Sequence, residues 1–367
     1  MKISYKINKE QYHVNFLDKS YEKIGKDLEK LGSDKKILFI FDKNINRKII
    51  NEIHLNLKFS GCKIYKLEFL GNKKNKSLKS TLKIIDFLLK EGFTKKSVII
   101  SLGGGVLGDL CALAASLYMR GLLYFHIPST MTAMIDSCIG GKTAINYQNI
   151  INSIGTYYHA NNVYIFSSII DLLPDREFFS GIPEILKCGL IKKNRILKLL
   201  EKNHLKIKKR DKKIIKILCL ETLKTKLHFF TKDVNEKNTR LMLNFGHTFA
   251  HSIEMATGSF FSNQDYLRHG EAVGIGILCE LNYANGKNYT YRQVKRILKN
   301  YDLPIDLIDK RNVKSAKMQN EIFKNLFLDK KKINKNPRYI SVKKIGFPKI
   351  LEMKDFNKIN SVIKEIL

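Results

Sequence analysis

Short apolar runs recur through the first half of the chain, separated by segments with helical periodicity. This alternation predicts an α/β layer structure with a largely parallel sheet. The expected strands cover residues 37–41, 64–70, 97–102, 122–127 and 163–166, and a helix is expected over 77–92. From about residue 179 helical periods replace these runs, at residues 181–204, 211–231, 246–257, 270–286 and 290–300.

The chain has 367 residues, too many for one ordinary hydrophobic core, so two domains are expected. The change of pattern places an α/β domain over residues 1–178 and a predominantly α-helical domain over residues 179–367. We see no repeat or low-complexity linker between them, and we therefore expect the two domains to abut with a cleft between them.

The formal charge of +32 raises the question of nucleic-acid binding. Only 11 of the 66 basic residues are arginine, and the lysines are spread along the whole chain rather than gathered into one stripe. This distribution indicates a compositional bias toward lysine on solvated faces, so we expect no nucleic-acid partner. A positive field would still favour the approach of an anionic substrate.

No apolar run approaches the roughly 18 residues of a membrane-spanning helix, so no membrane partner is expected. The first residues lack the apolar block of a secretory signal, which predicts a cytoplasmic protein. Six scattered cysteines without a C-x-x-C pair indicate buried thiols rather than a zinc cage or a redox couple.

A glycine-rich turn follows the expected strand at 97–102 and leads into an apolar helix at 110–118. Gly103, Gly105 and Gly108 satisfy the pattern G-x-G-x-x-G. Bare backbone at a helix start lets a diphosphate approach the N–H groups, where the helix dipole favours negative charge. The turn follows at least two earlier strands, and no acidic residue lies about 20 positions downstream, unlike an ordinary Rossmann fingerprint. A tight turn without a ligand is the alternative interpretation.

A second segment, residues 128–146, places Asp136 before the turn Gly140-Gly141-Lys142. The ammonium of Lys142 could face a phosphate group. The segment resembles the end of a P-loop, but aspartate stands where the first glycine of a P-loop is required. We therefore do not expect a nucleoside triphosphatase.

Three histidines and a glutamate form a candidate metal site. His247 and His251 are separated by one helical turn, His269 begins the next helix, and Glu184 shares a helix face with Lys187. Two histidines and one glutamate are a catalytic zinc set that leaves a position open for substrate. Spacing alone leaves open which two histidines bind the metal, and structural histidines are the alternative.

These motifs occur in the order found in the 3-dehydroquinate synthase family, from about residue 36 to about residue 345, and the chain resembles that family. The shared segments include GGGVLGD, IGGKTA, LNFGHT and HGEAV. Their joint occurrence is specific, whereas any one of them alone would not be. The resemblance implies a Rossmann-like NAD-binding domain followed by an α-helical domain that binds metal and substrate.

The resemblance also implies an activity: conversion of 3-deoxy-D-arabino-heptulosonate 7-phosphate to 3-dehydroquinate and phosphate in the shikimate pathway of aromatic amino acid biosynthesis. The implied cofactors are NAD and Zn²⁺, with Co²⁺ as a possible substitute, and the implied assembly is a homodimer. NAD would be reduced and then reoxidised within one catalytic cycle, around a β-elimination of phosphate and before an intramolecular aldol closure.

Site residues follow from the same resemblance. The implied zinc ligands are Glu184, His247 and His269, and His251 is left as a proton-transfer group. The other implied catalytic or substrate-contacting residues are Arg120, Asp136, Lys142, Asn152, Lys187, Lys226, Glu236, Arg240, Asn244, and one of Lys330 and Lys331. The implied NAD contacts are Asp42, Asn44, Lys76, Gly103, Gly104, Gly105, Val106, Leu107, Gly108, Asp109, Ser129, Thr130 and Lys142.

Two cationic subsites suit a substrate with a carboxylate and a phosphate. Lys226 and Arg240 would hold the carboxylate. Lys142, a lysine at 330 or 331, and Arg120 would hold the phosphate, with Arg120 reaching across the dimer interface.

Three positions depart from the family pattern. Lys73 stands where relatives carry a glutamate for the adenosine ribose, and Ile151 stands where they often carry lysine. We therefore expect NAD to bind less tightly than in relatives. Asn238 replaces a usual glycine, which is tolerable if it adopts a left-handed turn.

Other functions would fit parts of the pattern. A sister cyclase such as 2-deoxy-scyllo-inosose synthase shares zinc, NAD and phosphate elimination, but the Lys226 and Arg240 pair favours a sugar acid. A metal-dependent alcohol dehydrogenase of the glycerol dehydrogenase kind would leave the cationic residues without a role.

Overall fold

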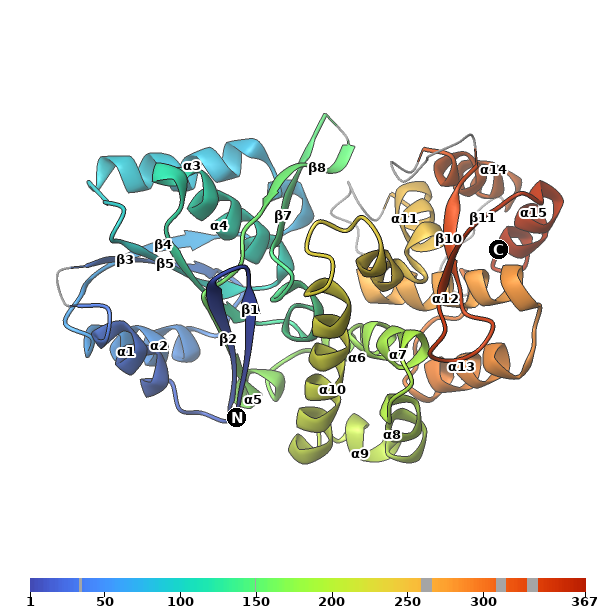
Figure 1. The fold of residues 1–367 in the computed structure, drawn as a ribbon, viewed down its shortest axis with the longest axis horizontal. Coiled ribbons are helices and arrows are strands. Elements are labelled where there is room, and N and C mark those ends of the chain that lie inside the picture. The colour runs from blue at the N-terminus through green and yellow to red at the C-terminus, as the bar shows by residue number, and fades with distance from the viewer. Residues whose placement is uncertain (33–34, 149, 259–265, 308–314, 329–335) are drawn as a thin grey trace. The chain divides into compact units, whose positions relative to one another are not determined.

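The computed structural model describes residues 1–32, 35–148, 150–258, 266–307, 315–328 and 336–367 (Figure 1). The chain divides into two compact units, Met1–Leu173 and Pro174–Leu367. Among the described residues, no helix combines the length and apolarity needed to cross a membrane. The six cysteines are buried thiols, as the sequence predicted.

Unit 1 is built on a seven-stranded sheet with the order β1-β2-β9-β6-β5-β3-β4. The pair β1–β2 is antiparallel and the other neighbours are parallel. The α/β sheet and its five predicted strands are confirmed, whereas the first two strands were not predicted. The strands are β1 (Lys2–Ile7), β2 (Glu10–Leu17), β3 (Lys36–Asp42), β4 (Lys63–Phe69), β5 (Val98–Gly103), β6 (Leu123–Pro128) and β9 (Asn162–Phe166).

Helices cover both faces of this sheet, with α3 and α4 on one face and α1 and α2 on the other (Figure 1). Burial on both faces explains why the central strands are continuous apolar runs rather than alternating ones. The predicted helix at 77–92 is present as α3, and Gly92 follows it with φ 60°. The helices are α1 (Glu22–Glu29), α2 (Arg47–Lys58), α3 (Leu78–Lys90), α4 (Gly105–Leu117) and α5 (Ser167–Ile170).

The order of strands creates a topological switch point between β3 and β5. The chain leaves β3 toward β4 on one side and continues with β5 on the other side. Asp42 ends β3 and Gly103 ends β5, and the neighbouring residues Phe41 and Leu102 are paired across the two strands. Ligands of open α/β sheets bind at the carboxyl ends of strands at such a point.

A separate hairpin of β7 (Lys142–Tyr147) and β8 (Ile150–Tyr157) completes unit 1. The backbone N–H of Asn146 donates to the carbonyl of Lys76 at 2.9 Å, which ties the hairpin to the segment before α3. The sequence did not predict this hairpin, because β8 is largely exposed and carries several polar residues.

Unit 2 is predominantly helical, as predicted. Four of its predicted helices match within one residue at each end, but the segment predicted as one helix at 181–204 is divided. Asn194 accepts a hydrogen bond from Ile196 N at 2.9 Å and starts a new helix there. The elements are α6 (Asp175–Phe179), α7 (Ile182–Ile191), α8 (Ile196–Lys202), α9 (His204–Lys208), α10 (Lys212–Phe230), η4 (Thr239–Asn244), α11 (His247–Ala256), α12 (His269–Asn285), α13 (Tyr289–Asn300), α14 (Ser315–Leu326), β10 (Arg338–Ser341), β11 (Lys349–Glu352) and α15 (Phe356–Lys364).

Glycines let the helices of unit 2 approach one another at backbone distance. A Cβ on Gly276 of α12 would lie 2.0 Å from the carbonyl oxygen of Gly246, the residue before α11. A Cβ on Gly270, at the start of α12, would lie 1.6 Å from the carbonyl oxygen of Ser180. The first residues of α11 and α12 are therefore fixed close to each other and to the segment leading into α7.

Candidate functional site

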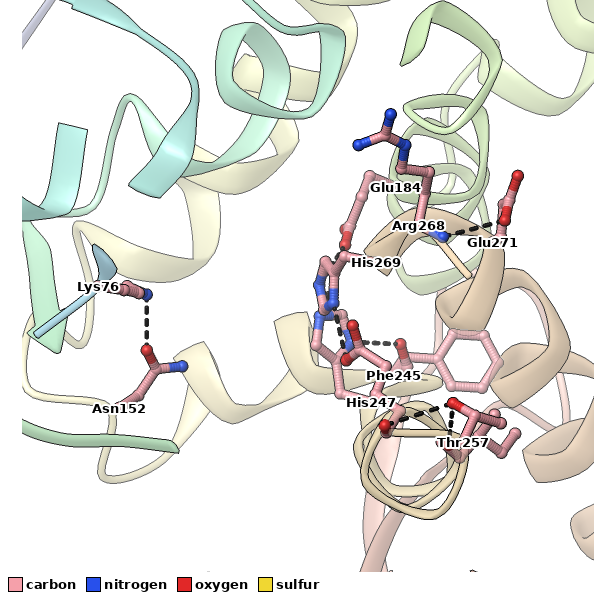
Figure 2. Close-up of polar contacts among 11 residues, drawn as sticks. Lys76, Asn152, Glu184, Phe245, His247, Thr257, Arg268, His269 and Glu271 are labelled. Atoms are coloured by element: carbon pink, nitrogen blue, oxygen red, sulfur yellow. Dashed lines mark hydrogen bonds and ion pairs between the residues drawn. The ribbon is translucent and has the colours of Figure 1, made fainter. Parts of the chain in front are cut away.

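Three of the predicted site residues converge in unit 2. Glu184 lies on α7, and His247 and His269 are the first residues of α11 and α12. One ligand atom from each lies within 4.8 Å of the other two. The Oε1 atom of Glu184 is 3.5 Å from Nε2 of His247 and 3.6 Å from Nε2 of His269 (Figure 2). Among the described residues, the cluster contains His247 and His269 and not His251, which is the same set of histidines that the family resemblance implied.

His251 lies one helical turn further along α11, beside the cluster. Its ring centroid is 5.6 Å from that of His247 and 6.2 Å from that of His269. The imidazole is therefore near enough to exchange a proton with a molecule bound at the cluster.

Glu184 suits a cation in both burial and charge. Its side chain is 1% exposed, and Oε1 accepts no hydrogen bond from the residues that the structure describes. Burial raises the pKa of Glu184, but the ammonium of Lys187 and the imidazole of His269 outweigh burial and lower it to about 2. A buried carboxylate facing two imidazole nitrogens is a donor set that fits a divalent metal ion.

Each histidine of the cluster has a fixed partner on its other ring nitrogen. The carbonyl oxygen of Phe245 accepts from Nδ1 of His247 at 3.1 Å (Figure 2). Nδ1 of His269 lies 3.2 Å from Oε2 of Glu254. Such contacts orient metal-binding imidazoles so that Nε2 points at the ion. Glu254 was not predicted as a site residue, although it lies two helical turns after His247 on the same face of α11.

An ion-pair network fixes the start of α12 and hence His269. Arg176 on α6 donates from Nε and Nη2 to the two oxygens of Glu271, both at 2.8 Å. Glu271 also accepts from the backbone N–H of Arg268 at 3.0 Å (Figure 2), and the Arg268 guanidinium pairs with Glu177 at 2.7 Å. This network was not predicted, because Arg176 and Glu271 are 95 residues apart in the sequence.

Three predicted cationic residues are buried in unit 2. Lys187, Lys226 and Arg240 are 1%, 6% and 2% exposed. Lys187 pairs with Glu184 on the same helix. Lys226 lies on α10 and Arg240 on η4, and both of these elements pack against α7. Buried positive charge is costly unless it is paired, so the three cations depend on partners at these positions.

The turn before η4 positions Arg240. The backbone N–H of Arg240 donates to Asp233 Oδ2 at 3.0 Å, and Nη1 of Arg240 donates to the carbonyl of Val234 at 2.6 Å. Asn244, also predicted, donates to Glu236 Oε1 at 2.7 Å. Asn238, which replaces a usual glycine of the family, has φ −140° and does not adopt a left-handed conformation. The positive φ in this turn, 56°, belongs to Glu236 instead.

In unit 1 the predicted cofactor residues gather at the switch point. Asp42 accepts from the backbone N–H of Asn44 at 3.0 Å and of Gly71 at 3.2 Å. Gly103 accepts from the backbone N–H of Ser129 at 2.9 Å. The contact of Asp42 with Gly71 joins the end of β3 to the segment after β4, and the contact of Gly103 with Ser129 joins the end of β5 to the residue after β6.

Helix α4 begins inside the glycine motif, at Gly105, rather than at the expected residue 110. A Cβ on Gly104 would lie 3.1 Å from a side-chain carbon of Thr130, and a Cβ on Gly103 would lie 2.6 Å from Leu107. The remaining predicted residues of this turn, Val106, Gly108 and Asp109, therefore belong to the first helical turns. A helix N-terminus of this kind favours the binding of an anion such as a diphosphate.

A pocket in unit 1 lies beside this helix start. Its lining includes Gly105, Gly108, Asp109 and Lys142. The pocket brings the glycine turn and the exposed predicted cation Lys142 together. Asp136 is half-buried in the segment that precedes Lys142.

Lys76 joins two other predicted residues. Its ammonium pairs with Asp109 at 2.7 Å and donates to Asn152 Oδ1 at 2.6 Å (Figure 2). Arg120 is exposed and has φ 63°. Lys330 and Lys331 lie outside the described residues. Of the departures from the family pattern, Lys73 begins a short 3-10 helix and Ile151 lies in β8.

Family comparison covers most of the chain. Residues 66–180 match the family described as 3-dehydroquinate synthase N-terminal, and residues 181–332 match 3-dehydroquinate synthase C-terminal. The 3-dehydroquinate synthase of Thermodesulfovibrio yellowstonii is 33% identical over 354 residues, which cover 93% of this chain and 96% of the relative.

Solved structures share the fold. A 2-deoxy-scyllo-inosose synthase complexed with carbaglucose-6-phosphate, NAD⁺ and Co²⁺ matches with a TM-score of 0.83 and 22% identity over 100% of both chains. A 2-epi-5-epi-valiolone synthase from Streptomyces hygroscopicus with NAD⁺ and Zn²⁺ bound matches with a TM-score of 0.84 and 21% identity, covering 99% of this chain and 98% of the other.

Proposed function

The chain belongs to the 3-dehydroquinate synthase family, and we propose on this basis that it converts 3-deoxy-D-arabino-heptulosonate 7-phosphate to 3-dehydroquinate and phosphate. The enzyme is then a phosphorus-oxygen lyase of the shikimate pathway that uses NAD and a divalent metal ion. The proposal includes a homodimer in which Arg120 reaches the site of the partner subunit.

The observation that carries the proposal is the cluster of Glu184, His247 and His269. A buried carboxylate oxygen faces two imidazole nitrogens at 3.5 and 3.6 Å, which suits Zn²⁺ or Co²⁺. Three protein ligands leave coordination positions for substrate hydroxyl groups. The bound ion supplies Lewis-acid polarisation, which lowers the pKa of the hydroxyl that is oxidised.

NAD would bind in unit 1 at the switch point, against Asp42, the turn at 103–109, Ser129 and Thr130. When bound, it supplies a hydride acceptor that returns the hydride later in the same cycle, so that no NADH accumulates. The N-terminus of α4, at Gly105, favours the negative charge of the diphosphate.

The cationic residues of the chain would hold the two anionic groups of the substrate. Arg240 and Lys226 hold the carboxylate through charge-assisted hydrogen bonds, and Lys142 holds the phosphate. Asn244 orients the substrate beside them, and His251 holds or moves a proton next to the metal ligands. The presence of both Lys226 and Arg240, a cationic pair suited to a carboxylate, favours a sugar acid over the substrate of a sister cyclase.

The test is an assay with purified protein, Zn²⁺, a catalytic amount of NAD and the heptulosonate phosphate. We expect release of one phosphate for each 3-dehydroquinate formed and no net NADH. His247→Ala should abolish both products. NADH that accumulates without phosphate release would instead support an alcohol dehydrogenase, and activity only on a sugar phosphate without a carboxylate would support a sister cyclase.

A further inference from the structure

Glu254 is a fully buried acidic residue that the proposed chemistry does not use. It lies in the last turns of α11 with a relative exposure of 0%. Placing a carboxyl group in a protein interior is costly unless a specific partner compensates. Its Oε2 lies 3.2 Å from Nδ1 of His269, which belongs to a different helix.

This contact determines which nitrogen of His269 can face a metal ion. A metal ion needs the lone pair of Nε2, so Nδ1 must carry the ring proton and donate it to an acceptor. Oε2 of Glu254 is that acceptor. Nε2 then points toward Glu184, whose Oε1 is 3.6 Å away.

The two histidines of the cluster differ in the partner of Nδ1 and in their exposure, and both differences make Glu254 important for the orientation of His269. Nδ1 of His247 faces a neutral backbone carbonyl, whereas Nδ1 of His269 faces a carboxyl group. The side chain of His269 is also 35% exposed, compared with 11% for His247. Packing therefore fixes His269 less than it fixes His247, and the hydrogen bond to Glu254 has a larger part in its orientation.

Helix α11 contributes two side chains to the cluster, because the helical register places them on the same face. His247 and Glu254 are seven residues apart, two turns along one face of the helix. One helix thus provides a ligand and also the group that orients the ligand on α12.

We propose that Glu254 is a positioning residue of the metal centre, which holds His269 in the tautomer and orientation that bind the ion and strengthens the ion's binding. The proposal rests on the proposed function, because it requires a metal ion at the cluster. Carboxylate partners of this kind change metal affinity by about 10- to 100-fold.

The test measures Zn²⁺ affinity of the full-length apo protein by competition with a chromogenic chelator. Glu254→Ala should raise the Kd by about 10- to 100-fold. Glu254→Gln keeps an acceptor oxygen but loses the charge, so it should fall between Glu254→Ala and the wild type. Because glutamine is nearly isosteric with glutamate, Glu254→Gln tests the role of Glu254 in metal binding if the alanine variant fails to fold.

Glu280→Gln is the matched control. Glu280 is also 0% exposed, and its carboxylate accepts from the backbone N–H groups of Thr248 at 3.3 Å and Ile340 at 3.2 Å. This variant should lower the Tm but leave the Kd for Zn²⁺ within about twofold. The absorption bands of bound Co²⁺ should shift in Glu254→Gln and stay unchanged in Glu280→Gln, because only the former alters a ligand's basicity.

The outcomes separate this proposal from the function on which it rests. If the wild type binds Zn²⁺ and Glu254→Gln binds it with the same affinity and the same Co²⁺ spectrum, Glu254 is not a positioning residue. If the wild type itself binds no Zn²⁺, the proposed function fails, and the role of Glu254 fails with it.

Discussion

Gly276 and Gly246 touch through their backbones, since a Cβ on Gly276 would lie 2.0 Å from the Gly246 carbonyl oxygen. The contact joins α12 to the residue immediately before His247. The distance between the two histidine-bearing helices therefore depends on the absence of a single methyl group.

Gly276→Ala should destabilise the protein by about 3 kcal/mol or more, because backbone cannot move aside as a side chain can. Gly274→Ala is the control on the same helix, where a Cβ would meet side chains of Leu298 and Pro183 at 3.2 and 3.3 Å. It should change stability by less than about 1 kcal/mol, since alanine also favours the helix by about that amount. Urea unfolding measures both variants, and equal midpoints would contradict the packing described here.

Arg240→Lys should lower kcat/KM for the heptulosonate phosphate by about 10- to 100-fold, because lysine keeps the charge but loses the planar pair of donors. The loss should be much smaller for a sugar phosphate without a carboxylate. Arg195→Lys is the control, an arginine of the same unit with a side chain that is 58% exposed. Steady-state kinetics on both substrates tests the prediction, and an equal loss on the two would remove Arg240 from the carboxylate subsite.

Replacing Lys73 by Glu and Ile151 by Lys should tighten NAD binding by about tenfold, the effect of one added charge-assisted hydrogen bond. Lys74→Glu makes the same charge change as Lys73→Glu alone, at the exposed neighbouring position, and should leave the affinity unchanged. Calorimetric titration of NAD into each protein gives the affinities. No change in the double variant would mean that these positions do not weaken the cofactor site.

The buried His126 should make the free energy of unfolding depend on pH in the acidic range. Burial lowers the pKa of His126 to about 3, against a smaller opposite effect of a hydrogen bond with the backbone of Ser101. The unfolded chain therefore takes up a proton between pH 6.5 and pH 3 that the folded chain does not. Stability should be lost as the pH falls through this range, by at most about 1.4 kcal/mol per pH unit.

His126→Gln should flatten this acid limb, since glutamine takes up no proton. Thermal unfolding of both proteins from pH 7 to pH 4 measures the difference between their slopes. The same slope in the variant and the wild type would show that His126 does not contribute to the acid limb.

The sequence predicted the elements whose burial leaves a periodic pattern. Strands covered on both faces, such as β3 and β5, are continuous apolar runs, and α10 to α13 carry regular helical periods. The hairpin of β7 and β8 left no such pattern because β8 is largely exposed. The break between α7 and α8 depends on the side chain of Asn194, which a search for periodicity passes over.

The residues of the candidate site could be predicted only in part from the sequence. Local spacing found all three histidines and Glu184, but it could not select among the histidines, because the selection depends on how α7, α11 and α12 pack. Glu254 and Arg176 were missed for the same reason. Each acts on His269 or its helix from a different helix, and only the tertiary structure brings them together.

The three residues of the cluster come from helices that begin at residues 182, 247 and 269. A nascent polypeptide on the ribosome thus exposes Glu184 long before the chain contains its two imidazole partners. Metal capture by the complete triad cannot precede the emergence of α12, so loading of the ion is a late event in biosynthesis.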